Sequence, residues 1–524
     1  MRKISYLFLF LLFTSISFGQ QTTVSNVLNL RSAQHSGVIL QQDKLVGYYI
    51  FYLKEQVDKN NNAYEVELFD DNYNSTGTFE ITRPKSSYLA EMVYNGQNFM
   101  LHFYDKKTGY EFVTYDRDGN QVGSSNIPKK EVSSWDLMRI EQNSSSATEN
   151  VTIYPNSTEG FVRNSYTKNK KIGYEIIAYD NAANQTWSYA SKETSDMVET
   201  ADINEISNGI VTLTVTKKKN LTTKEMRVYC ALLNANDGSL IREFELGSDE
   251  EGQRSLLKSF YNEKKKTITI VGEYYKKGDD ILKSKSEGLY VKELNEAGEE
   301  IDDKKYAWKG DVDQFADVNG DSKKERPFYV YFHDVIISKN GHIFLIGEQF
   351  IKQVSAGGVA LNVLASAAGG QTNAGMFEIM IADMVVVELD DKKELVDFKL
   401  IEKKNTSVIL PQGMGLVSTA VLGYYMKSAG EFDYAFTSKN KEKDIYDVVY
   451  IDADRKESKD SKTKSDLMIG LINVKGGKLT NNRVPINCES KSWWIRPAKP
   501  GFISVSEYNK KAKEVIMRLE RLSY

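Results

Sequence analysis

The chain has 524 residues, of which 41% are hydrophobic and 27% are charged. Its 68 Lys and Arg against 72 Asp and Glu give a net charge of −4, so it lacks the strong basic excess of nucleic-acid-binding proteins, and we exclude nucleic acid as a partner. So long a chain exceeds one ordinary hydrophobic core, which predicts several domains or one repetitive assembly.

The N-terminus has the organisation of a secretory signal peptide at residues 1–19. Arg2 and Lys3 precede an apolar stretch at 4–13 that is too short to span a bilayer. Small residues ending at Gly19 predict cleavage before Gln20; the alternative is an uncleaved membrane anchor. No later segment reaches 18 uninterrupted apolar residues, so we expect a periplasmic or extracellular protein with no transmembrane segment in the mature chain.

A β-strand pattern follows the signal. The chain is rich in Tyr (31) and Phe (23) and contains only 8 Pro, a composition that favours strands. The pattern is clearest at 88–127, where strands are expected at 88–94, 98–104 and 110–116, followed by a short fourth strand. Asn95-Gly96 between the first two is typical of a hairpin turn. This region is therefore expected to form a four-stranded antiparallel meander.

Similar units recur to the C-terminus and predict an all-β fold, a single-ring β-propeller of seven or eight four-stranded antiparallel blades at 20–524. Packing blades in a ring covers both faces of each sheet and leaves only short edges. Expected strands include 161–166, 174–180, 210–215, 227–233, 266–273, 288–294, 342–348, 383–390 and 466–473. The alternative is a series of tandem β-sandwiches. No Pro/Gly/Ser-rich linker divides the chain, which favours one ring.

The two chain ends are expected to close this ring. The C-terminal region at 493–519 supplies three strands, and an N-terminal strand near 24–30 supplies the fourth. The recurring succession of strands and turns resembles that of secreted β-propellers without kelch or WD signatures. The chain is also similar to an uncharacterised family of long secreted bacterial chains. That resemblance implies the fold and no activity.

An apolar, Gly/Ala-rich insertion at 351–376 interrupts one unit. One interpretation is a helical or looped flap packed on the ring. The other is an exposed surface that contacts a partner or a membrane, because such a patch usually has a use. Gly, Asn and Gln interrupt it too often for a membrane span.

The segment 315–325 is the best candidate metal site. Asp317, Asn319, Asp321 and Glu325 could direct several oxygens at one cation, which suits Ca²⁺. The segment resembles the calcium loop of the FG-GAP repeat in integrin-type propellers, which implies ligand roles for these four residues. Ser322 and Glu325 depart from the family's Gly and final Asp, and the motif occurs once. The alternative is an Asx-rich turn without metal.

Two further pairs of residues have open roles. Trp493 and Trp494 are neighbours in an expected strand, so their rings should point to opposite faces, one into the core and one exposed, where it could contact a partner. The alternative, which we favour, is packing in the core or between blades. Cys230 and Cys488 could form one disulfide in an oxidising compartment, or remain two separate buried thiols, which we favour.

Catalytic motifs are absent from the sequence. His35, His102, His333 and His342 have no zinc-site spacing, and there is no His-Glu-x-x-His or Gly-x-Ser-x-Gly. The resulting hypothesis is a secreted or periplasmic, non-enzymatic binding or scaffold protein whose loops contact a protein or glycan partner. The alternatives are a propeller glycan hydrolase with carboxylates at the central channel, and a calcium-dependent adhesion module.

Overall fold

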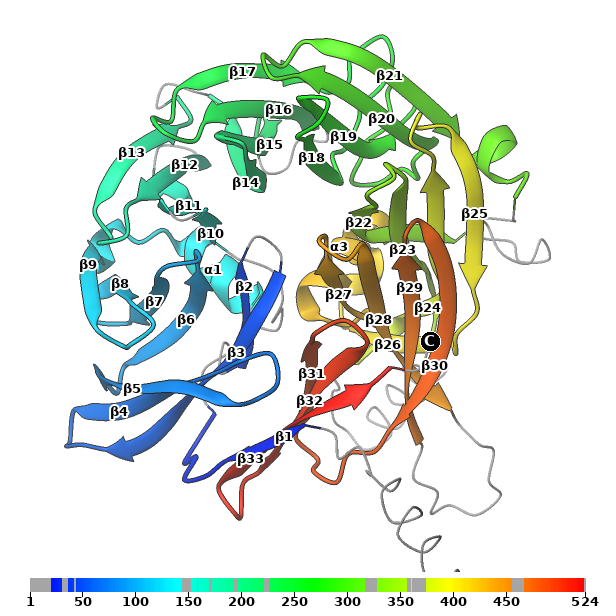
Figure 1. Ribbon diagram of the computed structural model, residues 1–524. Helices are drawn as coiled ribbons and strands as arrows, with labels where there is room; N and C mark the ends of the chain where they lie inside the picture. Colours follow the sequence, from blue (N-terminus) through cyan, green and yellow to red (C-terminus); the bar gives the residue numbers. More distant parts are fainter. Residues whose placement is uncertain are drawn as a thin grey trace, which may run out of the picture.

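The computed structural model describes residues 20–30, 36–41, 44–143, 152–157, 159–168, 172–192, 196–220, 226–315, 328–355, 360, 374–454 and 466–522. Its strands form eight antiparallel sheets that follow one another around a central axis (Figure 1). The expected β-propeller is confirmed, with eight blades, and the alternative of tandem β-sandwiches is excluded.

Each blade runs from an innermost first strand to an outermost last strand. Blades 1 to 4 consist of β2 (Ser36–Gln41), β3 (Lys44–Gln56), β4 (Asn61–Phe69) and β5 (Ser75–Pro84); β6 (Ser87–Tyr94), β7 (Phe99–Asp105), β8 (Gly109–Tyr115) and β9 (Gln121–Pro128); β10 (Ile153–Asn156), β11 (Gly160–Lys168), β12 (Ile172–Tyr179) and β13 (Gln185–Ala190); β14 (Val198–Ser207), β15 (Ile210–Lys218), β16 (Met226–Asn234) and β17 (Leu240–Glu245).

Blades 5 to 8 consist of β18 (Lys258–Asn262), β19 (Thr267–Tyr274), β20 (Gly288–Asn295) and β21 (Glu300–Ala307); β22 (Tyr329–Ile337), β23 (Ile343–Val354), β24 (Ala374–Leu389) and β25 (Leu395–Ile401), joined by β26 (Thr406–Pro411); β27 (Tyr434–Asn440), β28 (Ile445–Asp454), β29 (Asp466–Lys475) and β30 (Lys478–Ile486); β31 (Trp493–Pro497), β32 (Phe502–Asn509), β33 (Glu514–Arg521) and β1 (Gln21–Val24). Helical segments are η1 (Lys129–Glu131), α1 (Ser134–Asn143), η2 (Trp308–Val312), η3 (Met414–Leu416) and α3 (Thr419–Ala429).

The core lies between the blades. Successive side chains of a strand point to opposite faces of its sheet, so each strand can serve two neighbouring interfaces. In β12, Ile177 and Tyr179 pack towards blade 2, whereas Ile176 and Ala178 pack towards blade 4. Every pair of adjacent blades shares one such apolar cluster, including blade 8 with blade 1. The ring is therefore closed by side-chain packing.

The N-terminal strand β1 completes blade 8 as its outermost strand. It pairs antiparallel with β33, and Val24 lies opposite Val515 in the core between blades 8 and 1. The sequence analysis placed this strand near 24–30, whereas the structure places it at Gln21–Val24. Beyond it, Asn29 makes only an isolated bridge to Leu53 of β3.

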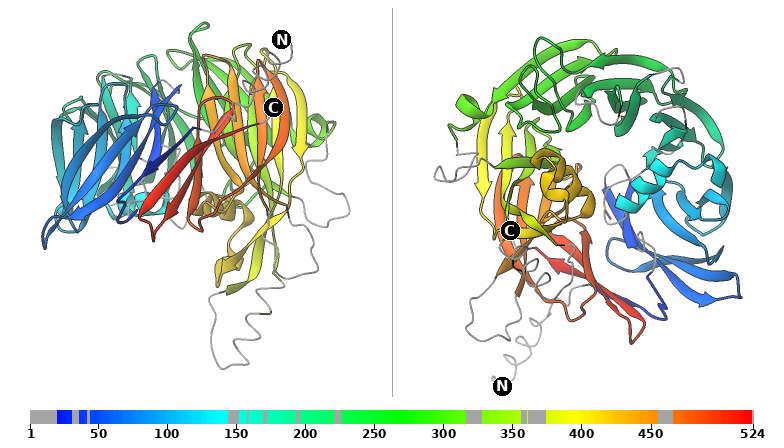
Figure 2. Two further views of the ribbon diagram at one scale, coloured as in Figure 1. Left: turned by 60° about the horizontal axis from the view of Figure 1, so that its bottom comes forward. Right: turned by 180° about the vertical axis from the view of Figure 1, so that it is seen from behind.

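Strand order gives the ring two different faces. The hairpin face carries the turns between the first and second strands and between the third and fourth strands of each blade. The insertion face carries the turns between second and third strands and the connections between blades, including α1 and α3. These two helices come from opposite sides of the ring and contact one another across the axis (Figures 1 and 2).

Helix α1 is fixed to blade 3 by a buried ion pair. Arg163 of β11 donates to Asp136 of α1 at 2.8 Å, and both side chains are almost fully buried. Asp136 also accepts from the Ser165 hydroxyl at 2.7 Å and from the Tyr166 amide at 2.9 Å. These hydrogen bonds to Asp136 hold the helix in one position over the channel.

Blade 6 departs from the expected four strands. Strands β23 and β24 are long and β26 pairs with β24, so this blade projects from the insertion face (Figure 2). Within the insertion expected at 351–376, residues 351–354 end β23 and residues 374–376 begin β24. The described ends of the insertion therefore continue the sheet, and most of the remainder lies outside the described residues.

Candidate functional site

A cavity of about 280 Å³ opens on the insertion face between blades 5 and 6. It lies beside the inner strand β22, and α3 forms one of its walls. Its volume is near the lower end of the range for small-molecule sites, ~300 Å³. The lining residues are Ser255, Leu256, Leu257, Glu273, Tyr275, Ile281, Ser284, Lys285, Ser286, Trp308, Tyr329, Val330, Tyr331, Phe332, His333, Phe350, Ala420, Tyr424 and Lys427.

Aromatic rings form much of the cavity wall. Tyr331 of β22 stacks on Phe432 with a centroid separation of 5.1 Å, and it meets Tyr424 of α3 edge-on at 5.8 Å. Tyr424 is 49% exposed, which is high for so large a ring. Aromatic side chains that are fixed by packing and open to solvent on one side provide ready contact area for a ligand.

Glu273 carries the one carboxyl group among the described residues that line the cavity. It is partly buried at the end of β19 and accepts a hydrogen bond from the Ser286 hydroxyl at 2.6 Å. Trp308 Nε1 in turn donates to Ser286 Oγ at 3.0 Å. The Ser286 hydroxyl is therefore held between Trp308 and Glu273.

The environment of Glu273 changes its proton affinity. Burial raises the pKa of Glu273 to about 7, against the opposing effects of the Ser286 hydrogen bond and the Lys285 charge. A carboxyl group of this kind is partly protonated near neutral pH, so it can either donate or accept a hydrogen bond to a ligand. Desolvation at the hydroxyl end of Tyr424, together with the nearby Glu273 charge, raises the pKa of Tyr424 to about 12 although half of the residue is exposed, so its hydroxyl stays protonated.

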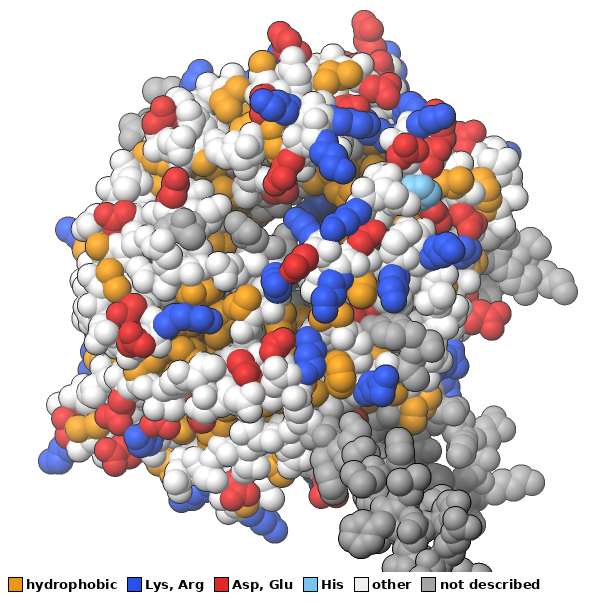
Figure 3. Space-filling view, in the orientation of Figure 1, with side chains coloured by type: hydrophobic (Ala, Val, Ile, Leu, Met, Phe, Trp, Pro, Cys, Tyr) orange, Lys and Arg blue, Asp and Glu red, His pale blue; other side chains and the backbone are white. Residues whose placement is uncertain are grey.

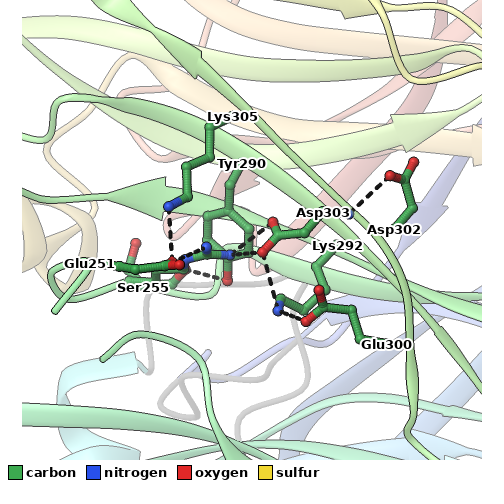
Figure 4. Close-up of polar contacts among 9 residues, drawn as sticks. Glu251, Ser255, Tyr290, Lys292, Glu300, Asp302, Asp303 and Lys305 are labelled. Atoms are coloured by element: carbon green, nitrogen blue, oxygen red, sulfur yellow. Dashed lines mark hydrogen bonds and ion pairs between the residues drawn. The ribbon is translucent and has the colours of Figure 1, made fainter. Parts of the chain in front are cut away.

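A charged network holds the wall that contains Ser255 (Figure 4). Arg254 is 3% exposed and donates to both carboxylate oxygens of Asp303 at 2.9 and 2.8 Å. The Arg254 guanidinium also lies 4.8 Å from the centre of the Tyr290 ring, and the Tyr290 hydroxyl donates to the Ser255 carbonyl at 3.0 Å. Because Ser255 Oγ accepts from the Glu273 amide at 3.3 Å, this network positions the backbone of Glu273.

A second charged network lies behind the wall formed by His333. Its side chain is fully buried, with Nε2 3.3 Å from Glu348, and its ring stacks on Tyr434 at 4.4 Å. Glu348 also contacts Lys403 at 3.0 Å, and Lys403 pairs with Asp433. Burial raises the pKa values of both Glu348 and Asp433, although Lys403 opposes this shift. The network joins blades 6 and 7, and it holds His333 in place in the cavity wall.

The sequence analysis missed both the cavity and the buried network. It predicted a strand over 266–273 and considered His333 for zinc-site spacing. In the structure, His333 is a bulged residue of β22, where the register shifts between Phe332 and Asp334. The bulge directs His333 towards Glu348, which is 15 positions away in the sequence, so no local motif revealed the pair.

The candidate calcium residues Asp317, Asn319, Asp321 and Glu325 lie outside the described residues, so calcium binding stays a prediction. Within the described part of the chain, no group of three or more His, Cys, Asp or Glu could hold a metal ion. In the same ranges, no helix is both long and apolar enough to span a bilayer.

The structure places the two tryptophans on opposite faces of β31, as expected for neighbours in a strand. Trp493 packs against the cluster between blades 7 and 8, and Trp494 packs against the cluster between blades 8 and 1. Both are partly buried, and neither lines the cavity. A partner-binding role for them remains a prediction.

The two cysteines are free thiols in separate clusters. Cys230 is buried between blades 4 and 5, and Cys488 is partly buried between blades 7 and 8. This agrees with the favoured interpretation of two separate thiols. Burial raises the pKa of the Cys230 thiol to about 12, which leaves it protonated and unreactive.

Known proteins give limited comparisons. No curated protein matches the chain. Among solved structures, the WD40 domain of SCAP from fission yeast has 6% identity and a TM-score of 0.36, covering 96% of this chain and 99% of its own. BamB from Moraxella catarrhalis has 9% identity and a TM-score of 0.23, covering 62% of this chain and 95% of its own.

One family model matches almost the whole chain. It covers residues 1–523, from the expected signal peptide to the end of blade 8, and it is described as a family of unknown function. The chain belongs to this family, DUF6770.

Proposed function

We propose that this protein is an exported, non-enzymatic binding protein that receives a sugar unit of a glycan in the cavity between blades 5 and 6. The observation that carries the proposal is the combination of open aromatic rings with hydroxyl groups and a single adaptable carboxyl group. The flat faces of Tyr331 and Tyr424 suit the C–H face of a sugar ring, and Glu273, Ser284 and Ser286 suit its hydroxyl groups.

Binding is favoured over hydrolysis by the number of carboxyl groups. Glycoside hydrolysis ordinarily uses two carboxyl groups on opposite sides of the scissile bond. The described lining of the cavity provides Glu273 alone. Export is proposed from the signal-peptide pattern at residues 1–19, and a protein partner is the other outcome that the experiment below distinguishes.

The test is a thermal-shift screen of neutral and acidic mono- and disaccharides, followed by calorimetry on each hit. Tyr424→Ala removes an exposed ring from the cavity wall. Tyr425→Ala is the matched control, because Tyr425 is also exposed on α3 but does not line the cavity. We expect Tyr424→Ala to weaken sugar binding about tenfold, consistent with the loss of one aromatic contact, and Tyr425→Ala to leave it unchanged.

Two results would contradict the proposal. One is that no sugar binds the wild-type protein, whereas a peptide or protein ligand does so through Tyr424. The other is turnover of a glycan that disappears in Glu273→Gln, which would assign a catalytic role to this carboxyl group.

A further inference from the structure

The hairpin face carries a second candidate surface, on the opposite side of the ring from the cavity. The turn between the first and second strands of each blade lies next to the central opening. In three consecutive blades, 5, 6 and 7, this turn carries exposed lysines, which we call the lysine rim. The rim consists of Lys264, Lys265, Lys266, Lys339, Lys441 and Lys443.

The rim occupies one side of the opening only. Figure 3 shows Lys and Arg side chains gathered on the side of blades 5 to 7, whereas the side of blades 2 to 4 has few of them. The corresponding turns of blades 2 to 4, at 95–98, 157–159 and 208–209, contain no lysine. A one-sided cluster within a chain of net charge −4 creates a local positive field.

The rim turns of blades 6 and 7 are held together by contacts between these two blades. Lys339 donates through its amide to Asp444 at 2.7 Å and through Nζ to the Glu442 carbonyl at 2.7 Å. The Tyr446 hydroxyl of blade 7 also donates to the Ile337 carbonyl of blade 6 at 2.6 Å. The backbones of the blade 6 and blade 7 turns are therefore fixed relative to one another.

Few acidic groups on these turns offset the lysines. Glu263 and Glu442 are the exposed carboxylates among the described residues of the three turns. Glu442 forms an ion pair with Lys44 of blade 1 at 2.8 Å, so part of its charge is balanced from outside the rim. The rim thus keeps a net positive charge.

We propose that the lysine rim binds an anionic polysaccharide that carries carboxylate or sulfate groups. Lysine presents a compact, strongly hydrated charge on a flexible stem, which suits repeated anionic groups along a flexible polymer. The described residues of the three turns include no exposed Arg, Trp, Tyr or large aliphatic side chain. Those residues anchor protein interfaces and membrane contacts, so their absence favours a polysaccharide over a protein or a lipid surface.

The test measures binding of fluorescent polygalacturonate to the full-length mature chain by anisotropy. The rim variant combines Lys264→Gln, Lys265→Gln, Lys339→Gln and Lys443→Gln. The matched control combines Lys106→Gln, Lys107→Gln, Lys129→Gln and Lys130→Gln, four exposed lysines that strand order places on the insertion face. Both variants lose the same charge, and such surface changes are expected to preserve the fold.

The rim variant is expected to bind at least about tenfold more weakly than wild type, and the control within about twofold. Binding should weaken further with added salt, and neutral dextran should not bind. Equal losses in the two variants, or tighter binding of poly-glutamate or oligodeoxythymidine than of polygalacturonate, would overturn the proposal. Tyr424→Ala should leave polygalacturonate binding unchanged. A failure of the lysine-rim proposal can therefore be distinguished from a failure of the proposed sugar site in the cavity.

Discussion

Glu273 shows how a single side chain acquires properties that its sequence context does not reveal. The strand that contains it was predicted, because Thr267–Tyr274 alternates and is rich in β-branched residues. Its place on a cavity wall depends on Ser286, Trp308 and Tyr424, which come from three other segments. The same holds for His333, Glu348, Lys403 and Asp433, since a buried network of distant residues leaves no local pattern.

The raised pKa of Glu273 predicts a pH-dependent contribution to stability. Its folded pKa is about 7 and an unfolded glutamate titrates near 4.3, so this contribution is present at low pH and is lost as the pH rises through 7. Glu273→Gln removes the ionisation, so above pH 7 this variant should be more stable than wild type, by up to about 3 kcal/mol.

Chemical denaturation of both proteins from pH 5 to pH 8 checks this expectation. Glu287→Gln serves as the control, because Glu287 pairs with Lys276 at the surface. If the difference between Glu273→Gln and wild type is independent of pH, Glu273 is not held in its protonated form by burial.

At the scale of elements, the sequence predicted the strands better than their exact partners. The three strands expected within 493–519 correspond to β31, β32 and β33. The ring-closing strand was expected near 24–30, whereas the structure forms it at Gln21–Val24. Val24, the first residue of the expected segment, is the last residue of β1, and there it lies opposite Val515 in the core between blades 8 and 1.

Strand β1 provides a direct test of ring closure. Val24 is 2% exposed, whereas its neighbour Thr23 points outwards. Val24→Asp places an unpaired charge between blades 8 and 1 and should lower the free energy of unfolding by more than about 3 kcal/mol. Thr23→Asp, the control, should change it by less than about 1 kcal/mol. Denaturant unfolding measures both, and similar losses would indicate that β1 does not seal the ring.

For the whole molecule, the propeller could be predicted because its signal repeats along the chain. Eight blades of the same kind require the same succession of strands and turns in every unit, and the sequence displays it. Blade 6 was harder to predict than the other blades, because the described parts of its insertion extend existing strands instead of forming a separate flap. The division into an insertion face with a cavity and a hairpin face with the lysine rim emerges only when the blades close into a ring.

The most direct test of our account is a crystal structure of the protein soaked with the tightest-binding sugar from the screen. We expect a sugar ring in the cavity between blades 5 and 6, packed against Tyr331 or Tyr424 and within hydrogen-bonding distance of Glu273. A sugar bound elsewhere on the ring, with the cavity left to solvent, would contradict the proposed site.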